Sequence, residues 1–561
     1  MRSEKKHILF SGAIILALAG ALVKVIGLVY KIPLTNLIKS EGMGYFNSAY
    51  TIYTFFYMLS TAGLPVAISM LVSQARTLGN RGRVKKIFST ATVIFLAVGI
   101  VGSLSMFFFA DFFAKMLGNP PAALSIKAIS PTLFFVTAIS VLRGYFQGHQ
   151  YMLPTALSQI AEALGKLGFG IFLAYTAIEK GYGYEKASAG AAIGLSIGMG
   201  LALVYLALTA VFFKSEKYYE YIYDNMPSGS RKSIINALVK AALPITFSAS
   251  VLSMSNTLDL AIVMHALVKS GLSSAAANAA YGNYTALAVP LFNLPIVLIT
   301  PIASTVVPYL AGAVSSGSSK KISSAVSVSL RTTALISFPC AMGLCALADP
   351  ILRLLFDDAL AQAAAPLLEL LAPSVIFLSL ATVTNALLQA LGRPLVPVFS
   401  MFAGAAVKII LCPLLIGRFS IKGTPISTFI CYFTVCAINF IFIYRDMKEK
   451  PRFFGTFMRP LFASLASSVS ASYACARLSR ILGQEIACLV SISLAAVIYF
   501  ILIVITRYLS GEEILMLPRG EKILKIFEKL GLVKKSERKS FENEGNRNFK
   551  SQRRAQDRRS C

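Results

Sequence analysis

The sequence contains little that would support a soluble enzyme or a disulfide-bonded secreted domain. Tryptophan is absent, and charged residues make up 14% of the 561 residues, against about 25% in a typical soluble domain. The first cysteine is Cys340, and the eight cysteines form no CxxC pair. We therefore expect neither a disulfide framework nor a structural zinc site, and a soluble fold of this length is excluded.

Motifs of nucleotide-driven and hydrolytic enzymes are also missing. The chain has no GxxxxGK[ST] loop and no HExxH motif, and its three histidines have no metal-ligand spacing. These absences exclude an ATP-driven step of the P-loop type. We expect a transporter and not an enzyme, with no cofactor and with no metal other than a coupling ion.

Apolar blocks longer than ~18 residues, each enough to cross a bilayer core as a helix, recur along the whole chain. They predict an all-α polytopic membrane protein with about fourteen transmembrane helices. The predicted spans are 8–30, 44–75, 87–110, 124–148, 153–178, 187–213, 236–263, 280–311, 323–347, 366–390, 395–417, 422–444, 457–477 and 485–507. The second and eighth are long and contain proline, so we expect kinks at Pro65 and at Pro290, Pro295 and Pro301.

The net charge of +28 follows the membrane topology. If the spans cross the membrane in alternating directions, most of the Lys and Arg residues fall in loops on the same side. This is the positive-inside pattern, and it excludes a nucleic-acid surface. We expect a multi-pass protein of the bacterial cytoplasmic membrane with both termini in the cytoplasm. The tail contains Ile523, Phe527 and Leu530 at helical spacing among lysines, which predicts an amphipathic helix on anionic membrane lipids, followed by disorder.

Two halves of the chain resemble one another. The matched residues, in the same order in both halves, are Tyr45 with Tyr281, Asn47 with Asn283, Pro65 with Pro301, Gln147 with Gln389 and Lys166 with Lys408. Such repeats are typical of secondary transporters, whose substrate site lies between the halves. We predict an N-lobe over 1–230 (helices 1–6), a C-lobe over 231–450 (helices 7–12), helices 13–14 over 451–508, and a basic tail over 509–561.

Among the ionisable residues well inside predicted spans are Lys24, Glu162, Lys166, Asp259 and Lys408. Each costs about 2.5–3.5 kcal/mol at the bilayer centre, so they must face a hydrated cavity or pair with one another. We hypothesise that the three lysines line a central cavity and bind an anion such as a pyrophosphate. Glu162 and Lys166 are one helical turn apart, and the alternative is that they simply pair.

Further candidates come from the same spans. Gln147 and Gln389, related by the repeat, are added to the substrate-binding set, whereas Arg143 is interpreted as an anchor at the inner interface. Asp259 and Asn256 share a helix face and are predicted to hold a coupling Na⁺ or H⁺. The alternative for Asp259 is that it is the partner of one of the lysines.

Three segments carry a family resemblance: GALVKVIGLVYKIPL (20–34), GYFNSAYTIYTFFYMLSTAGLPVAISMLVSQ (44–74) and LRGYFQGHQYMLPTALSQIAEALGK (142–166). The chain resembles the multidrug/oligosaccharidyl-lipid/polysaccharide (MOP) flippase superfamily. Within it, the chain is most similar to the branch of stage V sporulation protein B and lipid II flippase MurJ. The resemblance covers residues 8–507.

The resemblance implies two lobes in a V-shaped bundle that opens alternately inward and outward. It implies export of an undecaprenyl-pyrophosphate-linked saccharide, with helices 13 and 14 forming a groove for the polyprenyl tail. Lys24 matches a basic cavity residue of the family, and Asp259 matches its acidic residue for Na⁺. Lys31 departs from the pattern, since MurJ-like sequences have an acidic residue there.

Other functions remain as alternatives at this point. A cation-coupled multidrug antiporter of the same superfamily is the first, although such proteins usually have twelve helices and acidic cavities. A membrane polysaccharide polymerase is the second, although no large outer loop is predicted to hold its active site. We expect the protein to be a monomer whose partners are a lipid-linked saccharide and anionic lipids.

Overall fold

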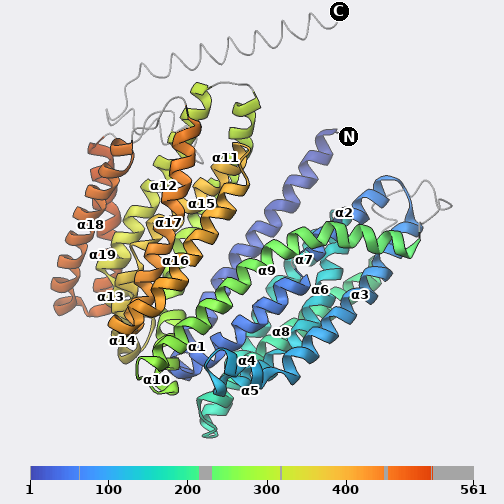
Figure 1. The fold of residues 1–561 in the computed structure, drawn as a ribbon, viewed down its shortest axis with the longest axis horizontal. Helices are drawn as coiled ribbons and strands as arrows, with labels where there is room; N and C mark the ends of the chain where they lie inside the picture. Colours follow the sequence, from blue (N-terminus) through green and yellow to red (C-terminus); the bar gives the residue numbers. More distant parts are fainter. Residues whose placement is uncertain are drawn as a thin grey trace, which may run out of the picture. The chain divides into compact units, whose positions relative to one another are not determined.

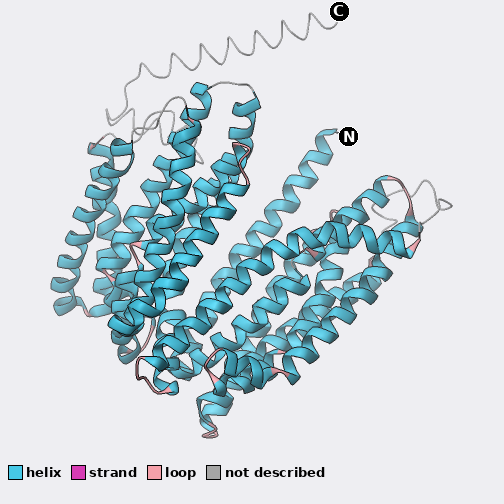
Figure 2. Cartoon of the chain, in the orientation of Figure 1, coloured by secondary structure: helices cyan, strands magenta, loops and turns pink. Residues whose placement is uncertain are grey.

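A computed structural model describes residues 2–61, 63–213, 230–315, 319–447, 453–506 and 508. These residues are almost entirely helical and include no strand (Figure 2). The predicted basic tail, 509–561, lies outside the described residues. The all-α class expected from the apolar blocks is confirmed.

The chain divides into two compact units, and each is considered by itself. The first holds residues Met1–Leu291, Leu355–Leu368 and Ala405–Thr428, and the second holds Phe292–Leu354, Glu369–Gly404 and Phe429–Cys561. The first unit therefore extends past the lobe boundary that we predicted at residue 230. The division into two repeat-related lobes and a terminal pair of helices stays a prediction.

The helices up to the middle of the chain belong to the first unit (Figure 1). They are α1 (Arg2–Thr61), α2 (Leu64–Thr77), α3 (Arg81–Phe108), α4 (Ala110–Met116), a 3₁₀ turn (Pro120–Ala122), α5 (Ala123–Ile129), α6 (Pro131–Gly148), α7 (Leu153–Glu179), α8 (Gly183–Phe212), α9 (Arg231–Lys269), α10 (Ser274–Gly282) and the π-helix η3 (Asn283–Ala288). The later helices are α11 (Val289–Ser315), α12 (Ser319–Ala346), α13 (Ala348–Leu355), α14 (Asp358–Leu371), α15 (Ser374–Ala390), α16 (Leu395–Phe419), a 3₁₀ turn (Ser420–Lys422), α17 (Gly423–Asp446), α18 (Phe453–Leu482) and α19 (Gln484–Ile505).

Membrane-spanning capacity is widespread in the described part of the chain. Nine helical stretches there are long and apolar enough to cross a bilayer, or ten when the bent pair α14–α15 is taken as one span. Two of the nine, Leu22–Thr77 and Leu395–Asp446, are 56 and 52 residues long, which is more than twice the ~20 residues that one crossing needs. Every predicted span falls on a helix, so the polytopic class is confirmed.

The breaks in these helices follow backbone chemistry. The helix α2 begins at Leu64, which places Pro65 in its first turn, where the missing N–H costs nothing. A kink at Pro65 stays a prediction. The π-helix η3 ends just before Pro290. Inside α1, Lys39 adopts φ 56° and ψ −174°, a left-handed conformation that bends the helix and that lysine rarely adopts. The sequence had predicted a loop there.

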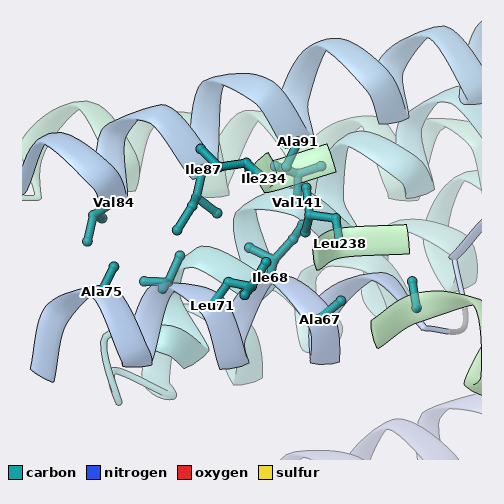
Figure 3. Close-up of a cluster of buried hydrophobic side chains, with 12 residues drawn as sticks. Ala67, Ile68, Leu71, Ala75, Val84, Ile87, Ala91, Val141, Ile234 and Leu238 are labelled. Carbon is teal, nitrogen blue, oxygen red and sulfur yellow. The ribbon is translucent and has the colours of Figure 1, made fainter. Parts of the chain in front are cut away.

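An apolar cluster joins four helices of the first unit. The side chains of Ile68, Ile87, Val141 and Leu238 come from α2, α3, α6 and α9 and are at most 3% exposed (Figure 3). Inside a bilayer such side chains stabilise helix contacts through close van der Waals packing. This cluster fixes the end of α6 that leads toward Arg143.

Helices α7 and α8 pack through glycine. A Cβ added to Gly165 would lie 2.6 Å from the Cα of Gly198, and one added to Gly194 would lie 2.2 Å from the Cα of Gly170. Small residues let helix backbones approach this closely in a membrane. The two helices are thereby held backbone to backbone.

In the second unit, α18 and α19 pack against one another and α12 packs against α18. The Tyr499 hydroxyl donates to the carbonyl of Leu335, at 2.9 Å, and the Tyr508 hydroxyl donates to the carbonyl of Thr456, at 2.7 Å. Asn439 on α17 donates to Thr384 on α15, at 2.9 Å. These buried polar contacts tie the helices of this unit together.

Candidate substrate cavity and ion pairs

A cavity of about 290 Å³ lies inside the first unit, among α1, α6, α7 and α8. Three of its side chains are charged, namely Arg143 on α6 and Glu162 and Lys166 on α7. The other lining residues are Val23, Gly27, Tyr30, Tyr50, Tyr53, Thr54, Tyr57, Met58, Val136, Ala163, Leu195 and Met199. The cavity thus combines an aromatic wall with a charged one.

The aromatic wall comes mainly from one face of α1. Tyr50, Tyr53 and Tyr57 follow one another at helical spacing, with ring centroids 5.7 and 5.8 Å apart. Tyrosine offers an apolar ring face with a hydroxyl at its edge. Such a wall suits a guest that has both apolar faces and hydroxyl groups.

Lys166 lies against two of these rings. Its Nζ atom is 4.6 Å from the centroid of Tyr30 and 5.5 Å from the centroid of Tyr50, which are cation–π distances. No carboxylate of the described residues lies within ion-pair distance of Lys166. Its positive charge is therefore presented to the cavity without an anionic partner.

Glu162 pairs with Arg143 and not with Lys166. The guanidinium of Arg143 donates to Glu162 at 3.0 Å and to the Ser158 hydroxyl at 3.0 Å. The simple pairing within α7 that was the alternative from the sequence is not the one in the structure. Arg143 is also a cavity residue, and its interpretation as an anchor at the inner interface stays a prediction.

A second ion pair of the first unit lies apart from the cavity lining. Lys408 on α16 donates to the Asp259 carboxylate on α9 at 2.8 Å, with side-chain exposures of 18% and 30%. Of the two alternatives for Asp259, the structure contains the lysine partner. The side chain of Asn256, the other candidate for ion coupling, lies outside the described residues.

The remaining candidates are not gathered around the cavity. Lys24 on α1 is exposed, although its neighbour Val23 lines the cavity. Gln147 is half-buried one turn beyond Arg143, and Gln389 is exposed in the second unit. The structure therefore unites Lys166 and Glu162 from the predicted substrate-binding set and leaves Lys24, Gln147, Gln389 and Lys408 off the lining.

Segments that the internal repeat relates pack against each other within the first unit. Asn47 on α1 donates to the Thr285 hydroxyl at 2.8 Å, and Asn278 donates to the carbonyl of Glu41 at 2.6 Å. The ammonium of Lys31 donates to the carbonyl of Thr285 in η3 at 3.0 Å. The contact of Lys31 with the π-helix could not be predicted from local spacing, because it joins residues 254 positions apart.

Comparisons with known proteins agree with this geometry. A family model described as "Polysaccharide biosynthesis protein" matches residues 9–314, and one described as "MatE" matches residues 244–414. In Bacillus subtilis (strain 168), an "Uncharacterized membrane protein YabM" is 29% identical over 436 residues, which cover 78% of this chain and 80% of that protein.

Two further relatives in that organism have descriptive names. "Stage V sporulation protein B" is 26% identical over 524 residues, covering 91% of this chain and 98% of the relative. "Lipid II flippase MurJ" is 25% identical over 463 residues, covering 78% and 82%. A solved structure, "Lipid II flippase MurJ, inward closed conformation", matches with a TM-score of 0.66 at 15% identity, covering 88% of this chain and 98% of that one. The fold of the chain is that of a MurJ-like transporter.

Proposed function

The chain belongs to the polysaccharide biosynthesis protein family of the MOP superfamily, and from this premise we propose that it is a flippase for lipid-linked saccharides. The substrate that we propose is an undecaprenyl-pyrophosphate-linked saccharide, either lipid II or a polysaccharide precursor. It is exported across the cytoplasmic membrane for the synthesis of cell wall, spore cortex or polysaccharide. The relative named as a lipid II flippase supports this class of substrate.

One observation carries the proposal, namely the joining of cations and tyrosines around one cavity. Lys166 has no carboxylate partner among the described residues and is free to attract a phosphate as a compact point charge. The Tyr50–Tyr57 face supplies apolar surface with hydroxyl groups for a saccharide. A lipid-linked saccharide has an anionic pyrophosphate and a hydroxylated sugar. The pyrophosphate would lie against the charged wall and the sugar against the tyrosine wall.

Arg143 and Glu162 give the cavity a second function. Because Glu162 holds Arg143, at 3.0 Å, the guanidinium is oriented before a guest arrives and loses little freedom on binding. An entering phosphate competes with Glu162 for the same donor groups. We propose that this exchange favours release as well as binding, which a transporter needs in each cycle under alternating access.

The test is native mass spectrometry of the full-length protein purified from its membrane, combined with a translocation assay in vesicles. We expect a co-purified polyprenyl-pyrophosphate saccharide, and transfer of a fluorescent lipid II analogue to the outer leaflet of protein-containing vesicles. Vesicles without protein serve as the baseline. Absence of both the bound lipid and the transfer would overturn the proposal.

The second candidate function is a cation-coupled multidrug antiporter, which the MatE match over 244–414 favours. It predicts efflux of an organic cation by vesicles that carry an opposing ion gradient. The lysine in the cavity repels such a substrate, which is why we rank this function second. Drug efflux without lipid transfer would reverse the order.

A further inference from the structure

We propose that the ammonium group of Lys408 is a built-in cation that occupies the carboxylate of Asp259, so that this chain binds no Na⁺ there. Lys408 then determines ion specificity, because it holds the place that a free cation would otherwise take. The inference goes beyond the proposed function, since it concerns cation binding whichever substrate is transported.

The geometry of the pair is that of an occupied cation site. The Nζ atom of Lys408 is 2.8 Å from Asp259, and both side chains are largely buried, at 18% and 30% exposure. The two residues come from helices far apart in the sequence, α16 and α9, so the contact depends on the packed unit. A Na⁺ ion and an ammonium group of the same charge cannot both lie against one half-buried carboxylate.

The surroundings of the pair supply further oxygen atoms. Tyr281 and Tyr284 lie close enough to interact electrostatically with Asp259 and Lys408. The Tyr284 hydroxyl is also 3.3 Å from the Thr428 hydroxyl. Hydroxyl and carboxylate oxygens are ligands that hard cations prefer, so a cation would find ligands here if the lysine were removed.

A tethered cation has an advantage over a free one. Lys408 is part of the same folded unit, so its effective concentration at Asp259 is far above that of ions in solution. A free Na⁺ ion must displace it and leave the lysine charge desolvated. The wild-type chain therefore discriminates against Na⁺ without any steric filter.

Lys166 and Lys408, which the internal repeat relates, have different roles. Lys166 has no carboxylate within ion-pair distance among the described residues and lies on tyrosine rings in the cavity, whereas Lys408 is neutralised by Asp259. One member of the related pair is thus available to a guest, and the other is committed to the protein. The same residue type at matched positions serves binding in one half and charge compensation in the other.

The experiment measures binding of radioactive ²²Na⁺ to the purified full-length protein in detergent, with choline chloride to keep ionic strength constant. We expect no saturable binding by the wild type. Lys408→Met removes the ammonium group but keeps an unbranched side chain, and we expect it to bind Na⁺. Na⁺ should then raise the melting temperature of Lys408→Met and leave that of the wild type unchanged.

Three variants serve as controls. Lys408→Arg keeps the charge and should bind no Na⁺, and Lys408→Met combined with Asp259→Asn should lose the new binding. Arg393→Met removes the cation from another ion pair, Arg393 with Asp446, in the second unit and should bind no Na⁺. This control separates a local site from a general effect of losing one positive charge.

Saturable Na⁺ binding by the wild type that Asp259→Asn abolishes would overturn the proposal, and this outcome requires no folded lysine variant. Na⁺-independent behaviour of a folded Lys408→Met protein would overturn it as well. Neither readout uses transport. Failure of the flippase assay and failure of the Na⁺ assay are therefore distinguishable.

Discussion

At the scale of single residues, sequence reasoning located charges within the spans and was weaker on their partners. It identified Glu162, Lys166, Asp259 and Lys408 from the cost of charge in a bilayer, and the structure places the first two at one cavity. It missed Arg143 as the partner of Glu162, because the pair joins two helices, and spacing rules detect only neighbours on the same helix. The pairing became visible only when α6 and α7 were packed.

Lys166→Ala is predicted to weaken binding of a lipid pyrophosphate roughly 10- to 100-fold, the usual effect of losing a contact to a charged group. Lys166→Arg keeps the charge and should retain most of the binding. The measurement is titration of a polyprenyl-pyrophosphate analogue against the purified protein. Equal affinity of Lys166→Ala and the wild type would remove Lys166 from the site.

His149 gives a prediction about pH. Burial lowers the pKa of this imidazole, which is 2% exposed at the end of α6 and packs against the Tyr145 ring. The unfolded chain therefore takes up a proton, near its ordinary pKa of about 6.5, that the folded chain resists. We expect the melting temperature to fall as pH drops below about 6.5, and to fall less in His149→Phe.

The control for this effect is His265→Phe, which removes a histidine that is exposed on α9. It should leave the slope of melting temperature against pH unchanged. A His149→Phe protein that keeps the full slope would show that other groups cause the acid sensitivity.

At the scale of helices, the length of the apolar blocks predicted the membrane spans well. It predicted the segments that connect the spans poorly. Each expected span is largely helical, although 44–75, 87–110, 124–148, 280–311 and 366–390 each cover a join between helices. The break at Pro65 was foreseen because proline removes a backbone donor. The helical structure on both sides of the kink at Lys39, in the stretch 31–43 between two predicted spans, was not foreseen. Contacts made by that stretch, such as Lys31 with Thr285, stabilise a helix that its own sequence only weakly favours.

Two glycines on α7 give a matched prediction. In Gly165→Ala, the new Cβ meets the Cα of Gly198, so the helices must separate, at a cost of about 1–3 kcal/mol. In Gly168→Ala, the Cβ meets nothing within 4 Å, and the better helix propensity of alanine should stabilise the protein by about 0.5–1 kcal/mol. Thermal unfolding of both variants in detergent measures the difference. Equal unfolding temperatures would contradict the close packing of α7 and α8.

At the scale of the whole molecule, the sequence predicted a multi-pass membrane protein, which the apolar helices and the similar proteins support. The lobe boundaries drawn from the repeat do not coincide with the two compact units, because packing is set by contacts and not by sequence symmetry. The orientation in the membrane rests on the distribution of Lys and Arg alone.

Both ends of the chain are predicted to lie in the cytoplasm. Alkaline phosphatase fused to either end should be inactive and green fluorescent protein fused to either end should fluoresce, because these reporters function on opposite sides of the membrane. A fusion within the 180–182 turn between α7 and α8 should give the reverse pattern. An active phosphatase at one terminus would mean an odd number of crossings.

The glycine contact between α7 and α8 also limits how the cavity can change its width. Glu162 and Lys166 project from α7, whose backbone lies directly on α8 at Gly165 and Gly198. The backbone of α7 therefore cannot retreat toward α8 to admit a bulkier headgroup. Adjustment to the size of a guest is left to the side chains that line the cavity, among them Leu195 and Met199 of α8.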